Sequence, residues 1–367
     1  MNLSDPTSET TEAASLSLKE RIPRKGSRCK PLNPAHGQLS RKPAECGSLS
    51  PGERAGVRRN DAPKLPSFFS QIGKVSSKNL CFILLLCSAF SAFAADKKIV
   101  LIAGSRSHGS GEHEFRAGCL LLQKCLDKIP GIAAAVYFDG WPDKPDAFDG
   151  AAAILIYSDG GDGHPAIQKD RLKVLGELMK KGVGLGCAHY AVELPKDKGG
   201  PEFLEWIGGY FEAYYSVNPH WDGSFTKFPR HPITRGVKPF TIRDEWYFHM
   251  RFPEGMKRVK PILTALPPDE ARGRPGTMDA HGGNPEVQKH KGEFEHTMWA
   301  IERPDGGRGF GFTGGHFHKN WANDNFRKVI LNALLWIAKA DVPRNGVESV
   351  VTEEDLKQNF DDKGKKK

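Results

Sequence analysis

Histidine and acidic side chains recur in short polar segments, and most of these segments directly follow a short apolar run. Imidazole and carboxylate groups exchange protons near neutral pH, and both bind divalent metal ions. A single histidine or aspartate in a loop is commonly a solvated surface group, so the repetition carries more weight than any one segment. The segments comprise residues 108–113, 159–165, 187–190, 244–247 and 314–318.

Three residues in these segments form the expected acid–base set, namely His189, Glu245 and His316. Imidazole and carboxylate groups are effective general bases, and burial can bring their pKa values close to neutrality. These residue types predict an enzyme that works by acid–base chemistry, with hydrolysis, elimination or isomerisation as the possible reactions. The side chains expected to bind its substrate are His108, His113, Asp159, His164, Tyr190, Asp244, Trp246 and His318.

Two alternative functions remain open at this point. The first is a divalent-metal-dependent hydrolase, because histidine and glutamate are common metal ligands. Its expected ligands are His113, His189, Glu245, His316 and His318. No His-Glu-x-x-His motif is present, so residue spacing gives this alternative no direct support. The second is a binding or scaffold domain without catalysis, since a fold does not fix a function. Clustered histidine and glutamate residues favour catalysis over simple binding.

Apolar strands alternate with helical segments after residue 97, which predicts a parallel sheet with helices on both faces. Branched apolar runs of about six residues are typical of buried parallel strands. Ligands bind at the carboxyl ends of such strands, where the polar segments lie. The expected strands are 98–103, 132–138, 151–157 and 183–187, with helices at 114–129 and 166–181.

The second half of the chain has a more mixed pattern. Residues 325–340 place apolar side chains on one side of a helix. The polar, glycine-rich segment 269–292 is expected to form a long surface loop, and the charged tail 342–367 is expected to be mobile. Further strands are expected at 240–243, 261–266, 297–302 and 309–313.

The positive charge of the chain is concentrated at its front. The 367 residues carry a formal charge of +9, yet residues 1–95 alone hold 14 Lys+Arg against 7 Asp+Glu. The remainder is nearly neutral, which argues against a nucleic-acid-binding protein. The fraction of hydrophobic residues, 38%, is that of a globular protein.

Residues 74–94 have the pattern of a secretory signal peptide, with basic residues, an apolar run from Leu80 to Phe90 and a cleavage site after Ala94. The run is shorter than the roughly 20 residues of a membrane-spanning helix, so no span is expected after cleavage. We therefore expect a periplasmic or secreted protein. Residues 1–73 are expected to be disordered and to precede a natural start near Val75. An internal anchor behind a cytoplasmic tail is the alternative.

Four segments in order resemble the ThuA-like (trehalose-utilisation) family: Gly182–His189, His231–Gly236, Asp244–Tyr247 and Thr313–His316. The resemblance extends from about Lys98 to Ala340 and implies one domain over 95–341. It implies the class I glutamine-amidotransferase-like fold, an α/β, flavodoxin-like, doubly wound and mostly parallel sheet. It also implies a link to sugar metabolism and a small-molecule carbohydrate as partner. The expected substrate of an enzyme is then a carbohydrate or keto-sugar, and the non-catalytic alternative is a carbohydrate-binding module.

The same resemblance argues against a glutaminase. His189 occupies the position of the cysteine nucleophile, and Cys187 lies two residues earlier. His318 replaces the carboxylate that the amidotransferase triad would carry two residues after His316. A nucleophilic role for Cys187 is disfavoured because no activating partner for its thiol is evident. The sequence leaves the oligomeric state open.

Overall fold

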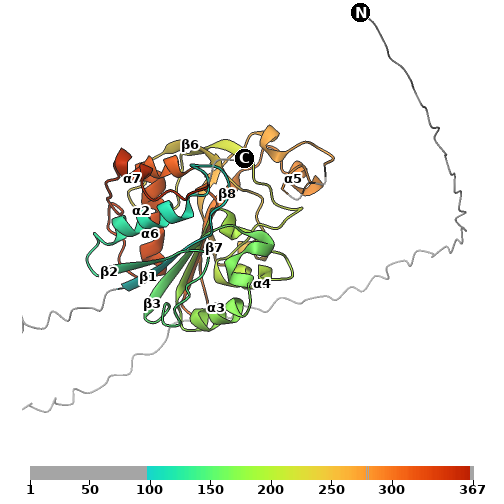
Figure 1. Cartoon of the computed structure of the whole chain (residues 1–367). Coiled ribbons are helices and arrows are strands. Elements are labelled where there is room, and N and C mark those ends of the chain that lie inside the picture. The colour runs from blue at the N-terminus through green and yellow to red at the C-terminus, as the bar shows by residue number, and fades with distance from the viewer. Residues whose placement is uncertain (1–96, 278, 280, 364–367) are drawn as a thin grey trace, which may run out of the picture. The chain divides into compact units, whose positions relative to one another are not determined.

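The computed structural model describes residues 97–277, 279 and 281–363 (Figure 1). The expected signal peptide at 74–94 and the segment 1–73 lie outside these residues. Within the described part of the chain, no helix is both long and apolar enough to cross a membrane.

A seven-stranded sheet forms the centre of the protein, in the order β2-β1-β3-β4-β9-β8-β7. The first five strands of this order are mutually parallel, whereas β8 runs antiparallel to both of its neighbours. The expected α/β class with a mostly parallel sheet is confirmed. The strands are β1 (Lys97–Ala103), β2 (Ile132–Tyr137), β3 (Ala151–Tyr157), β4 (Gly184–Ala188), β7 (Val259–Ala265), β8 (Glu295–Glu302) and β9 (Arg308–Phe312).

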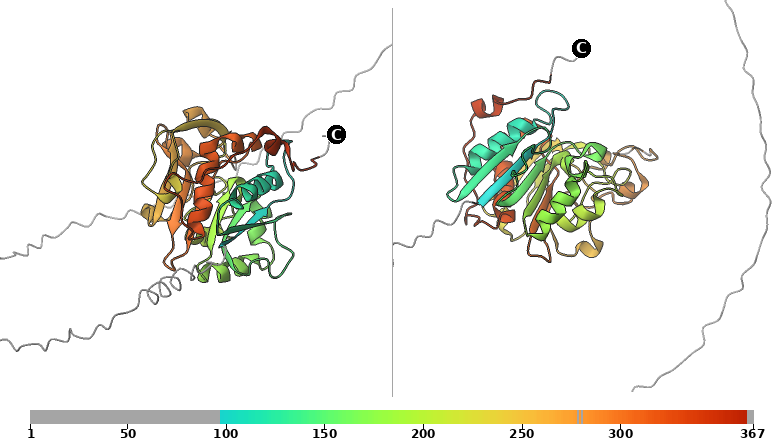
Figure 2. Two further views of the ribbon diagram at one scale, coloured as in Figure 1. Left: turned by 90° about the vertical axis from the view of Figure 1, so that its left-hand side faces the viewer. Right: turned by 60° about the horizontal axis from the view of Figure 1, so that its bottom comes forward.

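Helices cover both faces of this sheet (Figure 2). On one face α2 (Phe115–Leu126) and α6 (Asp324–Ile337) pack against a core that includes Ile99 and Leu101. On the other face α3 (Arg171–Lys180) and α4 (Gly200–Trp206) pack against a core that includes Val100 and Ile102. Successive residues of β1 thus enter opposite cores, as the two-residue period of a strand requires.

One expected helix is shorter than its apolar pattern predicts. Residues 166–181 do not form a continuous helix, because Pro165–Ile167 make a separate 3₁₀ turn and α3 begins at Arg171. Between the two, Lys169 adopts a left-handed backbone conformation with φ of 53°, which interrupts helical hydrogen bonding.

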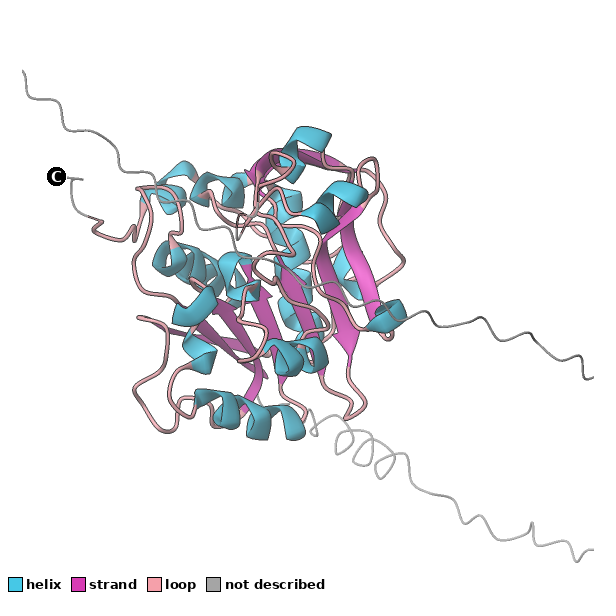
Figure 3. Ribbon diagram, turned by 90° about the vertical axis from the view of Figure 1, so that its right-hand side faces the viewer, coloured by secondary structure: helices cyan, strands magenta, loops and turns pink. Residues whose placement is uncertain are grey.

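A separate two-stranded antiparallel sheet lies beside the main one (Figure 3). It consists of β5 (His220–Phe225) and β6 (Phe240–Glu245), so the strand expected at 240–243 does not belong to the central sheet. The segment 269–292, expected to be a loop, contains the short helix α5 (Pro285–Lys289).

The described part of the tail packs on the domain. Val342 and Val347 are buried, and α7 (Glu353–Lys357) begins with a capping box at Thr352. Asp355 of α7 forms an ion pair with Lys124 of α2. Beyond α7, Lys363 pairs with Glu114, so the C-terminal segment also contacts the loop between β1 and α2.

Candidate metal centre

Five separate strands end at one place and deliver polar side chains there. His113 lies in the loop after β1, Asp159 follows β3, His189 directly follows β4 and His316 follows β9. Glu245 is the last residue of β6 in the small sheet. The carboxyl ends of parallel strands share one edge of a sheet, which explains why residues so distant in sequence meet.

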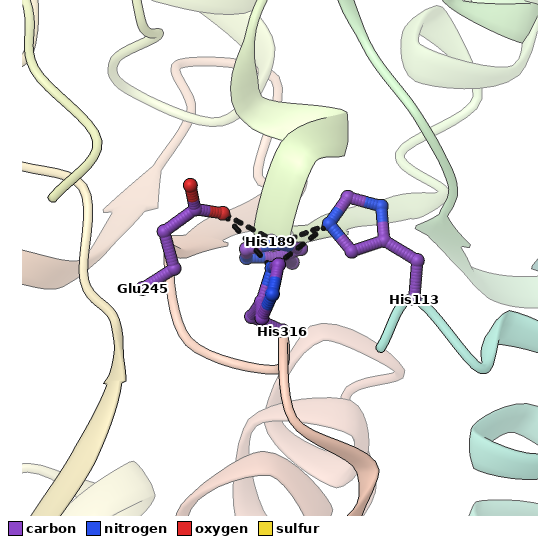
Figure 4. A group of neighbouring side chains, drawn as sticks. All are labelled: His113, His189, Glu245 and His316. Carbon is purple, nitrogen blue, oxygen red and sulfur yellow. Dashed lines mark hydrogen bonds and ion pairs between the residues drawn. The ribbon is translucent and has the colours of Figure 1, made fainter. Parts of the chain in front are cut away.

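Four side chains form what we call the histidine–glutamate cluster (Figure 4). One ligand-type atom from each lies within 4.8 Å of the corresponding atoms of the other three. Glu245 Oε2 lies 3.0 Å from His316 Nδ1 and 3.4 Å from His189 Nε2. All four members are buried or nearly so. They are His113, His189, Glu245 and His316.

Three histidines at this site have left-handed backbone conformations. The φ angle is 46° at His113, 56° at His189 and 58° at His108. Such conformations in residues other than glycine cost on the order of 1–3 kcal/mol each and persist where surrounding structure enforces them. At His189 the unusual φ lies at the sharp turn from β4 into a short 3₁₀ helix, which lets the ring point into the cluster.

A buried carboxylate fixes the segment that carries His316. Asp244 is fully buried, and its oxygens accept hydrogen bonds from the backbone N–H groups of Gly315 and His316 at 2.8 and 3.0 Å. It also accepts from the N–H of Glu245 at 2.8 Å. Asp244 therefore positions two cluster residues and is not exposed to a substrate.

Backbone and carboxylate acceptors determine the tautomers of two cluster histidines. His189 Nδ1 lies 2.9 Å from the carbonyl oxygen of Thr313, and His113 Nδ1 lies 2.7 Å from Asp159 Oδ1. Carbonyl and carboxylate oxygens only accept, so both Nδ1 atoms carry the hydrogen. The two Nε2 atoms therefore face each other, and they lie only 2.9 Å apart.

Burial and the close approach of the imidazole and carboxylate groups shift the pKa values of the cluster residues. Burial lowers the pKa of His113, and the neighbouring imidazoles lower it further. Burial also acts to lower the pKa of His189, but the Glu245 carboxylate outweighs it and raises the pKa above its ordinary value. Hydrogen bonds from His189 and His316 hold the pKa of Glu245 well below its usual range despite burial.

The spacing of donor atoms suits a small divalent cation. Donors at about 2.0–2.1 Å from a tetrahedral Zn²⁺ lie about 3.3 Å from one another. The separation of His113 Nε2 from His316 Nδ1 is 3.1 Å, and the two Nε2 atoms are 2.9 Å apart. An outward shift of a few tenths of an ångström would accommodate the ion. Carboxylate and carbonyl partners on the remote nitrogens are typical of metal-binding histidines.

Three further residues expected to bind substrate lie beside the cluster. His108 is about 40% exposed and its ring stacks on that of His113 with centroids 3.5 Å apart. Asp159 bonds to His113 and is about one-third exposed. The Tyr190 ring lies 6.2 Å from that of His113. These side chains lie at the rim, where they can contact a ligand.

Three other expected substrate-binding residues are enclosed in the fold. His164 is fully buried, and its two ring nitrogens bond to the backbone of Ala166 and Ala191. Trp246 is also fully buried and donates to the carbonyl of Ile242. His318 is 1% exposed and packs against Phe360. Each of these side chains contributes to packing or to local backbone geometry.

Three neighbours of the cluster were not among the expected site residues. His220 places its ring 4.8 Å from the His316 ring, and Asn218 donates to Glu245 Oε1 at 3.1 Å. Glu112 Oε1 lies 3.8 Å from His316 Nε2. In β5, the buried aromatic residues Trp221 and Phe225 alternate with exposed polar residues. This alternation is a sequence pattern typical of a strand and could have predicted β5, which begins at His220.

Cys187 does not take part in the site. It lies within β4, is fully buried, and belongs to the core on the face covered by α3 and α4. Burial raises the pKa of its thiol well above the ordinary value. A thiolate nucleophile is therefore disfavoured at this position.

Comparisons with known proteins support a family assignment. The family model ThuA, described as trehalose utilisation, matches residues 143–337. A ThuA-like protein from Bacteroides uniformis ATCC 8492 is 17% identical, with coverage of 66% of this chain and 92% of that chain and a TM-score of 0.49. A ThuA-like protein from Parabacteroides merdae ATCC 43184 is 16% identical, with coverage of 70% of this chain and 94% of that chain and a TM-score of 0.44. A search of curated proteins finds no match.

Proposed function

Because the chain belongs to the ThuA family of trehalose-utilisation proteins, we propose that it is a metal-dependent enzyme that acts on a carbohydrate. In this proposal the histidine–glutamate cluster holds one divalent metal ion. The expected acid–base residues His189, Glu245 and His316 then act as its ligands, with His113 as the fourth. A secreted or periplasmic location follows from the signal-peptide pattern at 74–94.

One observation carries the metal assignment. The imidazoles of His113 and His189 face each other through Nε2 atoms that lie 2.9 Å apart, and the Nδ1 hydrogen of each ring is already donated elsewhere. Lone pairs at that distance repel unless a cation lies between or beside them. A bound proton would relieve only one such contact, whereas a metal ion would accept all three imidazoles and the carboxylate at once.

The proposed reaction uses the metal ion and the partly exposed side chains around the cluster. A divalent metal ion acts as a Lewis acid that polarises a carbonyl or lowers the pKa of a bound water. His108 and Glu112 are each about 40% exposed beside the cluster, so they are available to transfer protons. The reaction class that suits these groups is hydrolysis, elimination or isomerisation of a sugar or its keto derivative.

The carbohydrate assignment rests on the family description and on the chemistry of the rim. Sugar hydroxyls need donors and acceptors rather than a compensating charge. Asp159 supplies an acceptor, and His108 and Tyr190 supply both functions with flat ring faces. Their placement beside His113 would orient a bound sugar toward the ion.

The metal is tested by elemental analysis and by titration of the protein with Co²⁺ and Zn²⁺. The wild type should take up one equivalent, and His189→Ala and Glu245→Gln should lose it. His290→Ala is the matched control, because His290 pairs with exposed Glu293 and is not a cluster member. Absence of stoichiometric uptake by the wild type would overturn the metal assignment.

Catalysis is tested with the metal-loaded protein on a panel of sugars and keto-sugars, with products identified by mass spectrometry. The triple variant of His189, Glu245 and His316 should lose turnover. Retained sugar binding in that variant supports an enzyme. Binding by the wild type with no turnover on any substrate would instead support the carbohydrate-binding module.

A further inference from the structure

The charge of Glu114, a fully buried residue next to the cluster, is balanced by Lys363 of the C-terminal segment. Glu114 has no exposed surface, and its Oε1 lies 3.3 Å from the Nζ of Lys363, whose side chain is only 5% exposed. The second carboxylate oxygen, Oε2, accepts the backbone N–H of Asp361 at 2.9 Å. A buried carboxylate without a partner is costly, so this pairing ties residues 361–363 to the loop after β1.

Lys363 also binds the backbone of that loop directly. Its ammonium group donates to the carbonyl of Gly109 at 3.0 Å and to the carbonyl of Glu112. One side chain therefore contacts three positions within residues 109–114. The loop contains His113, a cluster residue, and Glu112, whose carboxylate faces His316.

The opposite side of the loop rests on the segment that carries His316. The N–H of His113 donates to the carbonyl of His316 at 3.0 Å, and the N–H of His318 donates to the carbonyl of Gly111 at 2.9 Å. The loop is thus held between the C-terminal residues and the segment after β9. In Figure 2 the red C-terminal segment runs beside the teal loop.

Further contacts anchor the C-terminal segment from Thr352 to Lys363, which we call the C-terminal strap. Phe360 packs on the ring of His318 with centroids 5.0 Å apart. Asp355 pairs with Lys124, which attaches α7 to α2. The strap is therefore fixed at α7, where it contacts α2, and again at Lys363, where it contacts the loop after β1.

We infer that Lys363 is a positioning residue for the metal centre and that it acts through His113 and Glu112. This inference rests on the proposed function. When Lys363 holds the loop, His113 Nδ1 meets Asp159 and its Nε2 points into the cluster. Without the ammonium group, the Glu114 carboxylate keeps only the backbone N–H groups of Gly111 and Asp361 as partners and loses its counter-ion, which favours movement of the loop away from the strap.

The test uses the full chain with Lys363→Met and with the conservative variant Lys363→Arg. We expect Lys363→Met to weaken Co²⁺ binding by roughly tenfold or more, the range seen when groups that orient metal ligands are removed. The visible spectrum of bound Co²⁺ should change, as expected if His113 leaves the ion. Lys363→Arg should restore most of the affinity. Lys357→Met is the matched control, because Lys357 pairs with exposed Glu353.

Hydrogen–deuterium exchange gives a readout that does not depend on the metal. Lys363→Met should speed exchange at residues 109–114 and leave the strands unchanged, while Lys357→Met should not. The inference is overturned if Lys363→Met has the same exchange rates at residues 109–114 and the same Co²⁺ affinity as the wild type.

If the wild type binds no Co²⁺, the proposed function fails, and the exchange measurement still tests whether Lys363 holds the loop. If Lys363→Met does not fold, the double variant Glu114→Gln/Lys363→Met removes both buried charges and should show the same weakening.

Discussion

Asp159 and His113 are joined by the shortest hydrogen bond to a cluster residue, 2.7 Å from carboxylate to Nδ1. The bond leaves His113 Nε2 directed at His189 and His316. Asp159 is itself about one-third exposed, so a single residue both orients a metal ligand and reaches the solvent-facing rim. This relationship makes Asp159 the most informative residue to change outside the cluster.

Asp159→Asn should weaken metal binding by about 10–100-fold, the range typical of carboxylates that orient metal-bound histidines. The amide is a poorer acceptor for the His113 Nδ1 hydrogen and can turn a donor toward it. Competition with a coloured chelator measures the affinity. Asp162→Asn, an exposed change in the same loop, serves as the control and should retain wild-type affinity. Equal affinities in the two variants would contradict the role given to Asp159.

Asp244→Asn should destabilise the protein by about 3 kcal/mol, because a buried carboxylate that accepts several backbone N–H groups is replaced by a weaker acceptor. The new amide hydrogens would also oppose the backbone donors. Urea unfolding monitored by tryptophan fluorescence measures the change. The exposed pair of Asp222 with Arg243 provides the comparison, and Asp222→Asn should alter stability by less than about 0.5 kcal/mol.

Cys187 should resist alkylation in the folded protein. Its side chain is fully buried and its raised pKa leaves it as a thiol at neutral pH. Mass spectrometry after iodoacetamide treatment should find the native protein unmodified at this position and the urea-unfolded protein modified. Cys187→Ala should keep metal affinity within about twofold of the wild type. Rapid native alkylation with loss of turnover would instead indicate a cysteine nucleophile.

His164 should contribute a measurable pH dependence to stability. Burial lowers its pKa to about 4 from the ordinary 6.5, so the unfolded chain binds the extra proton between these values. Stability should therefore rise with pH from about 4 to 6.5 and then level off, with a contribution of ~3 kcal/mol over this range. His164→Asn, which can keep an acceptor and a donor, should show a smaller rise when unfolding is measured at pH 4.5 and pH 7. An equal rise in both proteins would contradict the lowered pKa of His164 in the folded state.

Local patterns in the sequence were sufficient for the alternating strands and helices on either side of the site. The branched run at 99–102 and the apolar stripe of α6 specify buried elements wherever they pack, because burial follows the period of the side chains. They were not sufficient for β5 and β6, whose pairing in a separate sheet depends on contacts between strands far apart in sequence.

Strand ends and the residues beside them are local features, so the amino-acid sequence was enough to predict the family, the α/β class and the positions of His189, Glu245 and His316 near strand ends. The folded chain was needed to show that His113, but not His318, joins these three residues. It also shows that His164 and Trp246 are enclosed and that Lys363 reaches Glu114. Hydrogen-bond partners and burial depend on which distant segments meet. Local sequence patterns do not specify these contacts, so the tautomers, the sets of neighbouring ligand-type atoms and the buried ion pairs can be assigned only from the folded chain.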